Sequence, residues 1–298
     1  MSFVSSETVT LKTNLADSPV TKALKEGAVT SSVVNLNFCG PKVAHDGFKP
    51  MLRQGAFDAG ELAIVTYLQA KLYKKPFVML PFPVSGKAQH PGVGYNKEFG
   101  HMDPKDIEGK KVGVRTYSQT TGLWLRGILQ HDFGVDLNKV TFLTTDVSHL
   151  AEYQDPPNCR LLSEGSNLGQ MLLNGEIAAG MLGMEMPKDP RIETLIPNAV
   201  KAGEEWVRRE GIVPINHLFV VGTELSKERP DVVREIYRML VESRKQAPES
   251  ATAVLPAYGF NAMRKTIEMA NDLAYEQKII SRKLSMDELF DDTTGVLN

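Results

Sequence analysis

The first 81 residues alternate short apolar segments with helical ones, and this order limits the fold more than any other feature. Val9–Thr13, Val33–Phe38 and Phe77–Pro81 have the apolar, β-branched character of buried strands. Helical patterns lie between them. One begins at Pro19 and stops at Gly27, a short one covers Phe48–Gln54 and stops at Gly55, and a third continues through Tyr73. Strands joined through helices run parallel, so the sequence predicts an α/β fold with a mostly parallel sheet flanked by helices.

Two interruptions of this pattern predict a division into two lobes. The first is the Pro81–Gly86 segment, with two prolines, and the second is the apolar strand GIVPINHLFVVG, which Pro214 interrupts. They enclose about 130 residues, a usual size for a domain. We therefore predict a discontinuous lobe of residues 1–83 and 215–298 and an inserted lobe of residues 84–214. A ligand cleft between the lobes, outside the carboxyl ends of the strands, is expected.

Charge and hydropathy exclude two classes of partner. The formal net charge is -2 and the pI is about 6.3, without the basic patch that nucleic acid or an anionic membrane requires. No run of eighteen apolar residues could span a bilayer. The segment MSFVSSETVTLKTNL has neither the basic nor the apolar region of a signal peptide, which predicts a cytoplasmic protein. Cys39 and Cys159 form no CxxC motif and are expected to be free thiols.

Residues 110–135 predict a strand, a polar turn and a helix in succession. Lys111–Arg115 is short and β-branched, and the helical pattern follows a hydroxyl-rich turn. Ser118, Thr120 or Thr121 could each cap the helix. Free N–H groups and the positive end of the helix dipole then favour a carboxylate or phosphate at this turn. The alternative is an ordinary capped turn that binds nothing.

Five motifs carry a resemblance to a known family. FDAGELAIVTYL, GKKVGV, YSQTTGLWLRGILQHDFGV, LGQMLLNGEIAA and GIVPINHLFVV occur in the order expected of 4,5-dihydroxyphthalate decarboxylase-like proteins, which resemble type II periplasmic solute-binding proteins. The resemblance covers roughly residues 10–245. The residues that match are Phe57, Asp58, Glu61, Tyr67, Thr120, Trp124, Arg126, Gly127, Gly175, Glu176, Ile177, Gly211, Pro214 and His217.

The resemblance implies a two-lobed, type II periplasmic-binding-protein-like fold and a decarboxylase of a hydroxylated, phthalate-like aromatic dicarboxylic acid. Such a reaction needs a carboxylate held out of the ring plane, a phenol that donates electron density and an acid that protonates the ring carbon. None of this strictly requires a metal or an organic cofactor, so we predict no cofactor. The chain has no HExxH motif, and no specific metal site is predicted, although a metal on the catechol oxygens stays open.

Three residues are candidates for the proton chemistry. His90 and His217 follow or lie within the two interruptions, and histidine titrates near neutral pH. Glu61 lies where a strand meets its helix and could act as acid, base or hydroxyl acceptor. The alternatives are a structural hinge residue for His217 and a helix-start carboxylate favoured by the dipole for Glu61.

The carboxylate is expected to bind Ser118, Thr120 and Thr121, with Arg115 adding a charge-assisted bond from the strand end. The alternative for Arg115 is a solvent-facing residue. The resemblance also predicts an Arg-His-Ser tripeptide where this chain has Gln89, His90 and Pro91. Lys87 could supply the missing cation, although lysine lacks the bidentate fork of arginine.

Other function classes stay open at this stage. The second hypothesis is a non-catalytic solute-binding or ligand-sensing protein of the same fold, which recognises a small carboxylate. A third is a biosynthetic protein of the same two-lobed type. The partner expected under the first hypothesis is a small aromatic carboxylate. A homo-oligomer is also open, although no interface pattern is legible in the sequence. Fold alone does not choose between catalysis and binding.

Overall fold

The computed structural model of the protein describes residues 8–298 and divides the chain into two compact units. Unit 1 contains the chain up to Lys87 together with Ile215–Glu268 and Lys283–Asn298. Unit 2 contains Ala88–Pro214 and Met269–Arg282. Within the described residues, no helix has the length and apolar character that crossing a membrane requires.

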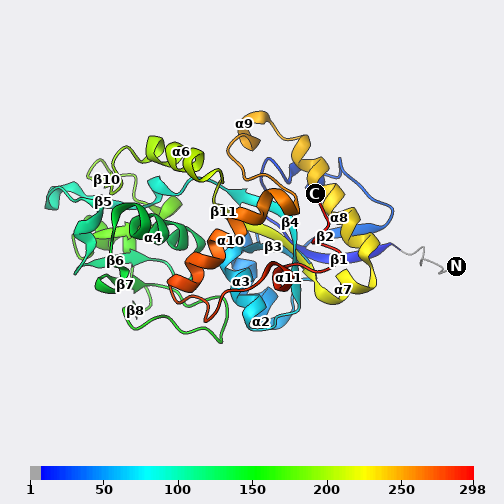
Figure 1. The fold of residues 1–298 in the computed structure, drawn as a ribbon, viewed down its shortest axis with the longest axis horizontal. Coiled ribbons are helices and arrows are strands. Elements are labelled where there is room, and N and C mark those ends of the chain that lie inside the picture. Colours follow the sequence, from blue (N-terminus) through cyan, green and yellow to red (C-terminus); the bar gives the residue numbers. More distant parts are fainter. Residues whose placement is uncertain (1–7) are drawn as a thin grey trace. The chain divides into compact units, whose positions relative to one another are not determined.

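The sheet of unit 1 has five strands in the order β2-β1-β3-β11-β4 (Figure 1). β1 pairs in parallel with β2 and β3, whereas β11 pairs antiparallel with both β3 and β4. Four strands therefore run one way and β11 runs the other, so the mostly parallel sheet predicted from the first 81 residues is confirmed. The strands are β1 (Val9–Asn14), β2 (Val34–Phe38), β3 (Ala59–Ala63), β4 (Phe77–Gly86) and β11 (Ile215–Gly222).

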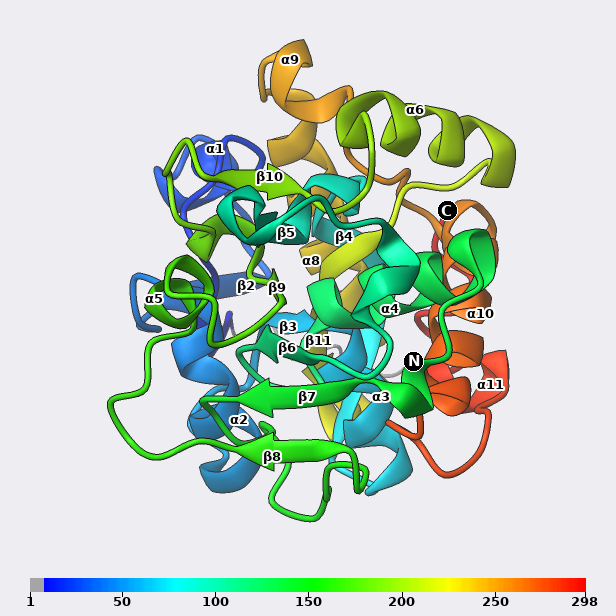
Figure 2. The same cartoon turned by 90° about the vertical axis from the view of Figure 1, so that its left-hand side faces the viewer.

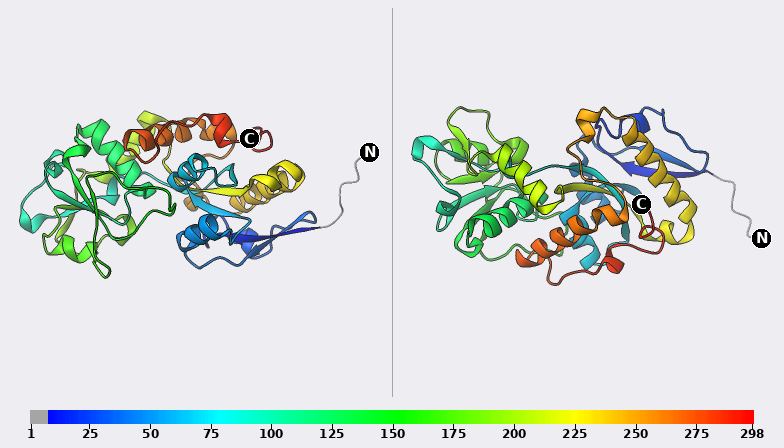
Figure 3. Two further views of the ribbon diagram at one scale, coloured as in Figure 1. Left: turned by 90° about the horizontal axis from the view of Figure 1, so that it is seen from below. Right: turned by 45° about the horizontal axis from the view of Figure 1, so that its top comes forward.

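Helices cover both faces of this sheet. The apolar side of α8 packs with alternate residues of β4 and β11, such as Leu80 and Phe219, in the main core of the unit. Figure 3 shows α8, in yellow, alongside this sheet. α3 packs against β3, β4 and β11, and Tyr67 Oη accepts a hydrogen bond from Met79 N at 3.2 Å. The helices that lie wholly or partly in unit 1 are α1 (Lys22–Lys25), α2 (Phe48–Gln54), α3 (Ile64–Leu72), α7 (Thr223–Glu228), α8 (Pro230–Lys245), α9 (Glu249–Thr252), α10 (Phe260–Glu276) and α11 (Met286–Leu289).

The expected lobe boundaries differ from the units in two places. Residues 84–87 stay in unit 1 because β4 continues through Pro81 and Pro83 to Gly86. Proline is tolerated there because β4 is an edge strand, where an absent N–H group removes no necessary ladder bond. Residues 269–282 join unit 2, where Leu273 packs so close to Gly127 that a Cβ there would lie 2.7 Å from its methyl groups.

Unit 2 has a six-stranded sheet in the order β10-β5-β9-β6-β7-β8 (Figure 2). β9, β6, β7 and β8 are parallel, and β5 is antiparallel to both of its neighbours. β8 and β10 escaped the sequence analysis because each has three residues, most of them exposed. The strands are β5 (Gly94–Asn96), β6 (Lys111–Val114), β7 (Thr141–Thr144), β8 (Cys159–Leu161), β9 (Ala179–Met181) and β10 (Ile192–Thr194).

Strand β6 places helices on opposite faces of this sheet. A Cβ on Gly122 of α4 would lie 3.3 Å from Val114, whereas a Cβ on Gly113 would lie 3.0 Å from Leu168 of α5. Because neighbouring strand residues point to opposite faces, α4 and α5 cover different sides. The helices are α4 (Thr120–Phe133), α5 (Leu168–Leu173) and α6 (Ala199–Glu210), with short 3-10 helices η2 (His90–Gly92), η3 (Lys97–Phe99), η4 (Pro104–Ile107), η5 (Leu137–Lys139) and η6 (Gly183–Glu185).

The contact between β1 and β3 depends on Gly60. This residue has φ of +152°, and a Cβ there would lie 2.3 Å from the carbonyl oxygen of Asn14. We expect Gly60→Ala to lower the free energy of unfolding by about 3 kcal/mol, because backbone atoms cannot move aside cheaply. Gly55→Ala is the matched control: Gly55 has φ of +64° with open space around it, so the loss should be about 1 kcal/mol. Urea unfolding of both variants checks the difference, and equal losses would contradict this account.

Candidate functional site

The first turn of α4 offers hydrogen-bond donors that no group of the protein accepts. Leu123 N donates to Gln119 O at 2.9 Å, and the N–H groups of Thr120, Thr121 and Gly122 have no acceptor within residues 8–298. The hydroxyl of Thr120 is also buried without a partner, on a residue that is 3% exposed. We call these three N–H groups and this hydroxyl the α4 cradle. Its donors and the positive end of the helix dipole suit a carboxylate.

The expected cap of α4 was wrong. The side chains of Ser118, Thr120 and Thr121 do not accept from its first turn, and the residue before the helix makes no side-chain cap bond. The Ser118 hydroxyl instead donates to the hydroxyl of Ser148 at 3.2 Å and lies 3.4 Å from that of Thr116. Ser148 comes from the loop after β7 and is buried. The hydroxyls of Thr116, Ser118 and Ser148 therefore bond with one another, and the helix N–H groups and the Thr120 hydroxyl stay open.

A buried guanidinium lies under the same turn. Arg126 is fully buried; its Nε donates to Gln277 Oε1 at 2.8 Å and its Nη2 to Tyr117 O at 2.6 Å. Its Nη1 has no partner, and a Cβ on Gly122 would lie 2.8 Å from it. No carboxylate of the described chain lies within 4.0 Å of this guanidinium. A fixed positive charge therefore adds to the helix dipole beside the α4 cradle.

Thr121 faces two glycines that bring other loops against α4. A Cβ on Gly92 would lie 3.4 Å from Thr121 Cγ2, and one on Gly183 would lie 3.6 Å from the same atom. Gly92 belongs to η2, and Gly183 begins η6 after the carboxyl end of β9. The turn that begins α4 thus lies near the carboxyl ends of the parallel strands β6 and β9, the usual place for ligands in an open α/β sheet.

His90 lies beside this turn but in a packed environment. It is 2% exposed, and its ring meets the edge of Trp206 at a centroid distance of 6.0 Å. Burial lowers the pKa of His90, Arg209 lowers it further and Asp132 opposes the shift. The buried Nδ1 has no hydrogen-bond partner within the described residues. A neutral imidazole is therefore the favoured form, and its role in catalysis stays a prediction.

Two further cations were predicted to bind the ligand. Arg115 forms an ion pair with Asp146, with Nη1 and Oδ2 3.5 Å apart, and its carbonyl accepts from Asp146 N. Lys87 is an exposed residue directly after β4, and it belongs to unit 1. Ligand binding by Arg115 and Lys87 stays a prediction, whereas the buried cation beside the α4 cradle is Arg126, which the sequence analysis did not select as a ligand.

Unit 1 brings Glu61 and His217 together. Glu61 Oε1 and His217 Nδ1 are 2.5 Å apart, and Glu61 Oε2 accepts from Ala16 N at 3.1 Å. The Glu61 side chain is 4% exposed, whereas that of His217 is 26% exposed. The ring of Phe48 meets His217 edge-on at 5.3 Å. A buried carboxylate thus orients an imidazole that keeps contact with solvent.

The charge of Glu61 fixes the orientation of the imidazole. Burial alone would raise the pKa of Glu61, but the hydrogen bond and charge of His217, the Ala16 N–H group and the charge of Lys25 together lower it. An ionised Glu61 only accepts hydrogen bonds, so His217 Nδ1 is assigned as the donor. His217 Nε2 has no partner within residues 8–298 and can exchange a proton with a ligand.

Potential metal ligands of the described chain do not gather in groups of three or more His, Cys, Asp or Glu residues. The next polar neighbours of the Glu61–His217 pair are the Ala16 N–H group and the Lys25 ammonium, a donor and a cation.

The fold and the site can now be compared with known proteins. No family model matches the sequence. The fold is that of the periplasmic binding proteins, with two mostly parallel sheets flanked by helices. The aliphatic sulphonate-binding protein SsuA from Escherichia coli covers 97% of this chain and 94% of its own, with a TM-score of 0.60 and 11% identity. The alkanesulfonate-binding protein SsuA from Xanthomonas axonopodis covers 95% and 98%, with a TM-score of 0.58 and 11% identity. The desulfurization enzyme DSZB covers 95% and 97%, with a TM-score of 0.55 and 10% identity.

Sequence relatives confirm the resemblance that the motifs indicated. The chain is 25% identical over 197 residues to the 4,5-dihydroxyphthalate decarboxylase of Comamonas testosteroni, a match that covers 60% of this chain and 58% of the relative. It is 23% identical over 169 residues to the protein of that name in Pseudomonas putida, covering 52% and 65%. The chain thus matches less than two thirds of the length of either relative.

The lowered pKa of Glu61 predicts a pH-dependent contribution to stability. A depressed folded-state pKa stabilises the protein above the ordinary carboxyl value of 4.5, and the contribution is lost as the pH falls through the folded pKa. We expect Glu61→Gln to be about 2 kcal/mol less stable at pH 7 and the difference to shrink on acidification. Urea unfolding from pH 7 to pH 3 measures this, with the exposed Glu164→Gln as control. A difference that does not depend on pH would contradict the assignment.

Proposed function

We propose that this protein is a cofactor-independent decarboxylase of a hydroxylated aromatic dicarboxylic acid. The observation that carries the proposal is the Glu61–His217 pair, in which a buried, ionised carboxylate orients an imidazole with an open Nε2. The similarity to the two proteins named 4,5-dihydroxyphthalate decarboxylase supports a substrate of the phthalate class. A cytoplasmic location stays a prediction.

The α4 cradle has the role of holding the carboxylate in this proposal. Its N–H groups and the Thr120 hydroxyl donate to the carboxylate oxygens, and the Arg126 charge stabilises the anion. Donors that are fixed before the ligand arrives cost little reorganisation. This part of the site would serve a binding protein equally well.

Proton transfer is the role that we assign to His217. Protonated His217 gives its Nε2 proton to the ring carbon that bears the carboxylate, while electron density from a ring hydroxyl supports the new carbon–hydrogen bond and Glu61 offsets the charge of the imidazolium before transfer. The bond between that carbon and the carboxylate then breaks, carbon dioxide leaves, and the electron pair of the broken bond restores the aromatic ring.

The second candidate is a non-catalytic binding protein for a small carboxylate. The similarity of the fold to two sulfonate-binding proteins supports it, as does Gln89 in place of the arginine that the resemblance predicts. The desulfurization enzyme with the same fold supports catalysis on this scaffold equally well. Fold therefore does not decide, and the chemistry has to be measured.

Turnover of 4,5-dihydroxyphthalate, followed as release of carbon dioxide, tests the enzyme. We expect His217→Gln to reduce kcat at least 100-fold with a smaller change in KM, since general acid catalysis contributes about 10²–10⁴. His90→Gln measures whether the buried histidine matters as well. No release by the unaltered protein, together with thermal stabilisation by aromatic carboxylates, would favour the binding protein.

The α4 cradle predicts a loss of carboxylate affinity in Thr120→Val. This change removes the unpartnered hydroxyl at nearly constant volume, and we expect Kd for phthalate to rise about tenfold, the loss of a hydrogen bond to a charged group. Thr266→Val is the control, because Thr266 is a buried helical threonine of unit 1. Calorimetric titration gives both affinities. Equal Kd values for Thr120→Val and the unaltered protein would remove the cradle from the site.

A further inference from the structure

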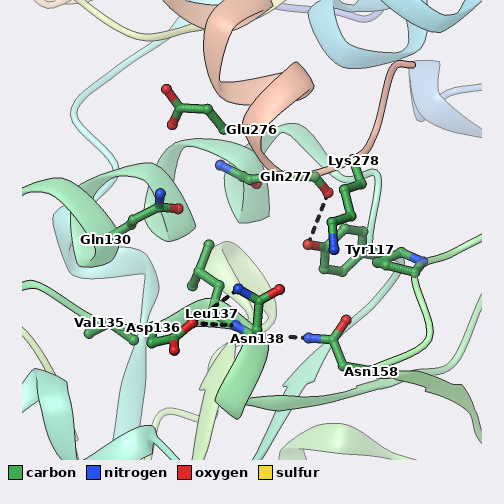
Figure 4. A pocket seen from close by; sticks show the side chains of 11 residues that line it. Tyr117, Gln130, Val135, Asp136, Leu137, Asn138, Asn158, Glu276, Gln277 and Lys278 are labelled. Carbon is green, nitrogen blue, oxygen red and sulfur yellow. Dashed lines mark hydrogen bonds between the residues drawn. The ribbon is translucent and has the colours of Figure 1, made fainter. Parts of the chain in front are cut away.

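A partly open cavity of unit 2 lies beside the last turn of α4. Its volume is about 110 Å³, far more than the roughly 10–15 Å³ that one water needs. Its walls include the last turn of α4, the segment around η5 and the residues at the end of α10 (Figure 4). Most of the side chains that line it are polar. Tyr117 and Gln277, which hold Arg126, also line this cavity, but no group of the α4 cradle or of the Glu61–His217 pair does.

Lys278 supplies the positive charge of the cavity. It lines the space with φ of +60°, a left-handed conformation that is uncommon for residues other than glycine. Its ammonium group has no hydrogen bond or ion pair within the described residues. Figure 4 shows its side chain running toward Tyr117, whose hydroxyl donates to Gln277 O at 3.2 Å. This left-handed conformation is the usual end of a helix, here α10, and the lysine is exposed, so its ammonium group without a counter-ion can meet an anionic group at the mouth of the cavity.

The other walls of the cavity carry hydrogen-bond acceptors and a carboxylate. Asn158 donates twice through Nδ2, to Leu137 O and Val140 O, which leaves its Oδ1 as an acceptor. Asn138 donates through Nδ2 to Asp136 and likewise keeps a free Oδ1 within the described residues. Bonds from Asn138 and the charge of Lys139 lower the pKa of Asp136, which keeps this lining residue ionised.

The lining carries both positive and negative charges, which disfavours a ligand that is only an anion or only a cation. A plain anion would meet Lys278 but also Asp136 and Glu276, and a plain cation would meet Lys278. Glu276 is already paired with His131 at 2.7 Å, and Figure 4 shows its carboxylate turned away from Lys278. A ligand with a carboxylate at one end and a hydrogen-bond-donating cation at the other satisfies both sides.

We propose that this cavity binds a small zwitterion of the α-amino-acid class. Lys278 holds the carboxylate, and Asp136 with the Oδ1 atoms of Asn138 and Asn158 accepts from the ammonium group. The volume limits the ligand to a short side chain. The site is distinct from the proposed decarboxylase site and does not depend on that function.

Titration of the ¹⁵N-labelled full chain with L-alanine tests the proposal, with acetate and ethylamine as probes of each charge alone. We expect saturable shifts of the side-chain amide signals of Asn138 and Asn158 with L-alanine, at an affinity at least tenfold above that of either single-charge probe. Lys278→Asn should weaken L-alanine binding at least tenfold, because asparagine tolerates the left-handed backbone but lacks the charge.

Two controls separate this site from other effects. Lys74 also has a left-handed backbone, with φ of 55°, so Lys74→Asn should leave the affinity unchanged. Thr120→Val should leave it unchanged as well, which distinguishes the cavity from the α4 cradle. Shifts that do not saturate, an equal affinity for acetate, or binding that survives Lys278→Asn would each overturn the proposal.

Discussion

The antiparallel insertion of β11 between β3 and β4 is the constraint on which unit 1 depends. A strand from the second half of the chain is hydrogen-bonded on both sides within a sheet begun by the first half. Its register pairs His217 with Ala63 and Phe219 with Glu61, so Glu61 and His217 lie two residues apart in register and share a face. Without β11, Glu61 would be a buried carboxylate without its imidazole partner, an arrangement that is costly in free energy.

Local sequence signals predicted the elements whose ends are set by local chemistry. The helix Phe48–Gln54 and its stop at Gly55 agree with the structure, because a left-handed glycine ends a helix wherever the helix packs. The helix expected after Pro19 is shorter in the structure and covers only Lys22–Lys25, because the Thr21 side chain bonds to Ser18 and Ala16 in a turn instead. The hydrogen bonds of that turn compete with helix formation, and residue spacing does not reveal them.

The features that could not be predicted from the sequence depend on contacts between distant parts of the chain. The prolines of β4 read as a break because an edge position is known only when the strand order is known. The candidate site likewise depends on residues that are far apart in the sequence. Glu61 and His217 were selected separately, and the structure joins them in one hydrogen bond. Ser148 and Arg126 gave no comparable signal, because the first reaches Ser118 from a distant loop and the second acts through its burial.

Gly122 ties two properties of the first turn of α4 to one position. The absence of a side chain there leaves room for the Arg126 guanidinium, since a Cβ would lie 2.8 Å from Nη1 and 3.3 Å from Val114. Nη1 has no hydrogen-bond partner in the described part of the chain, so nothing else holds that end of the guanidinium. Any larger residue at position 122 would therefore displace either the buried charge or the start of the helix, so the electrostatics of this turn and its packing on β6 cannot change independently.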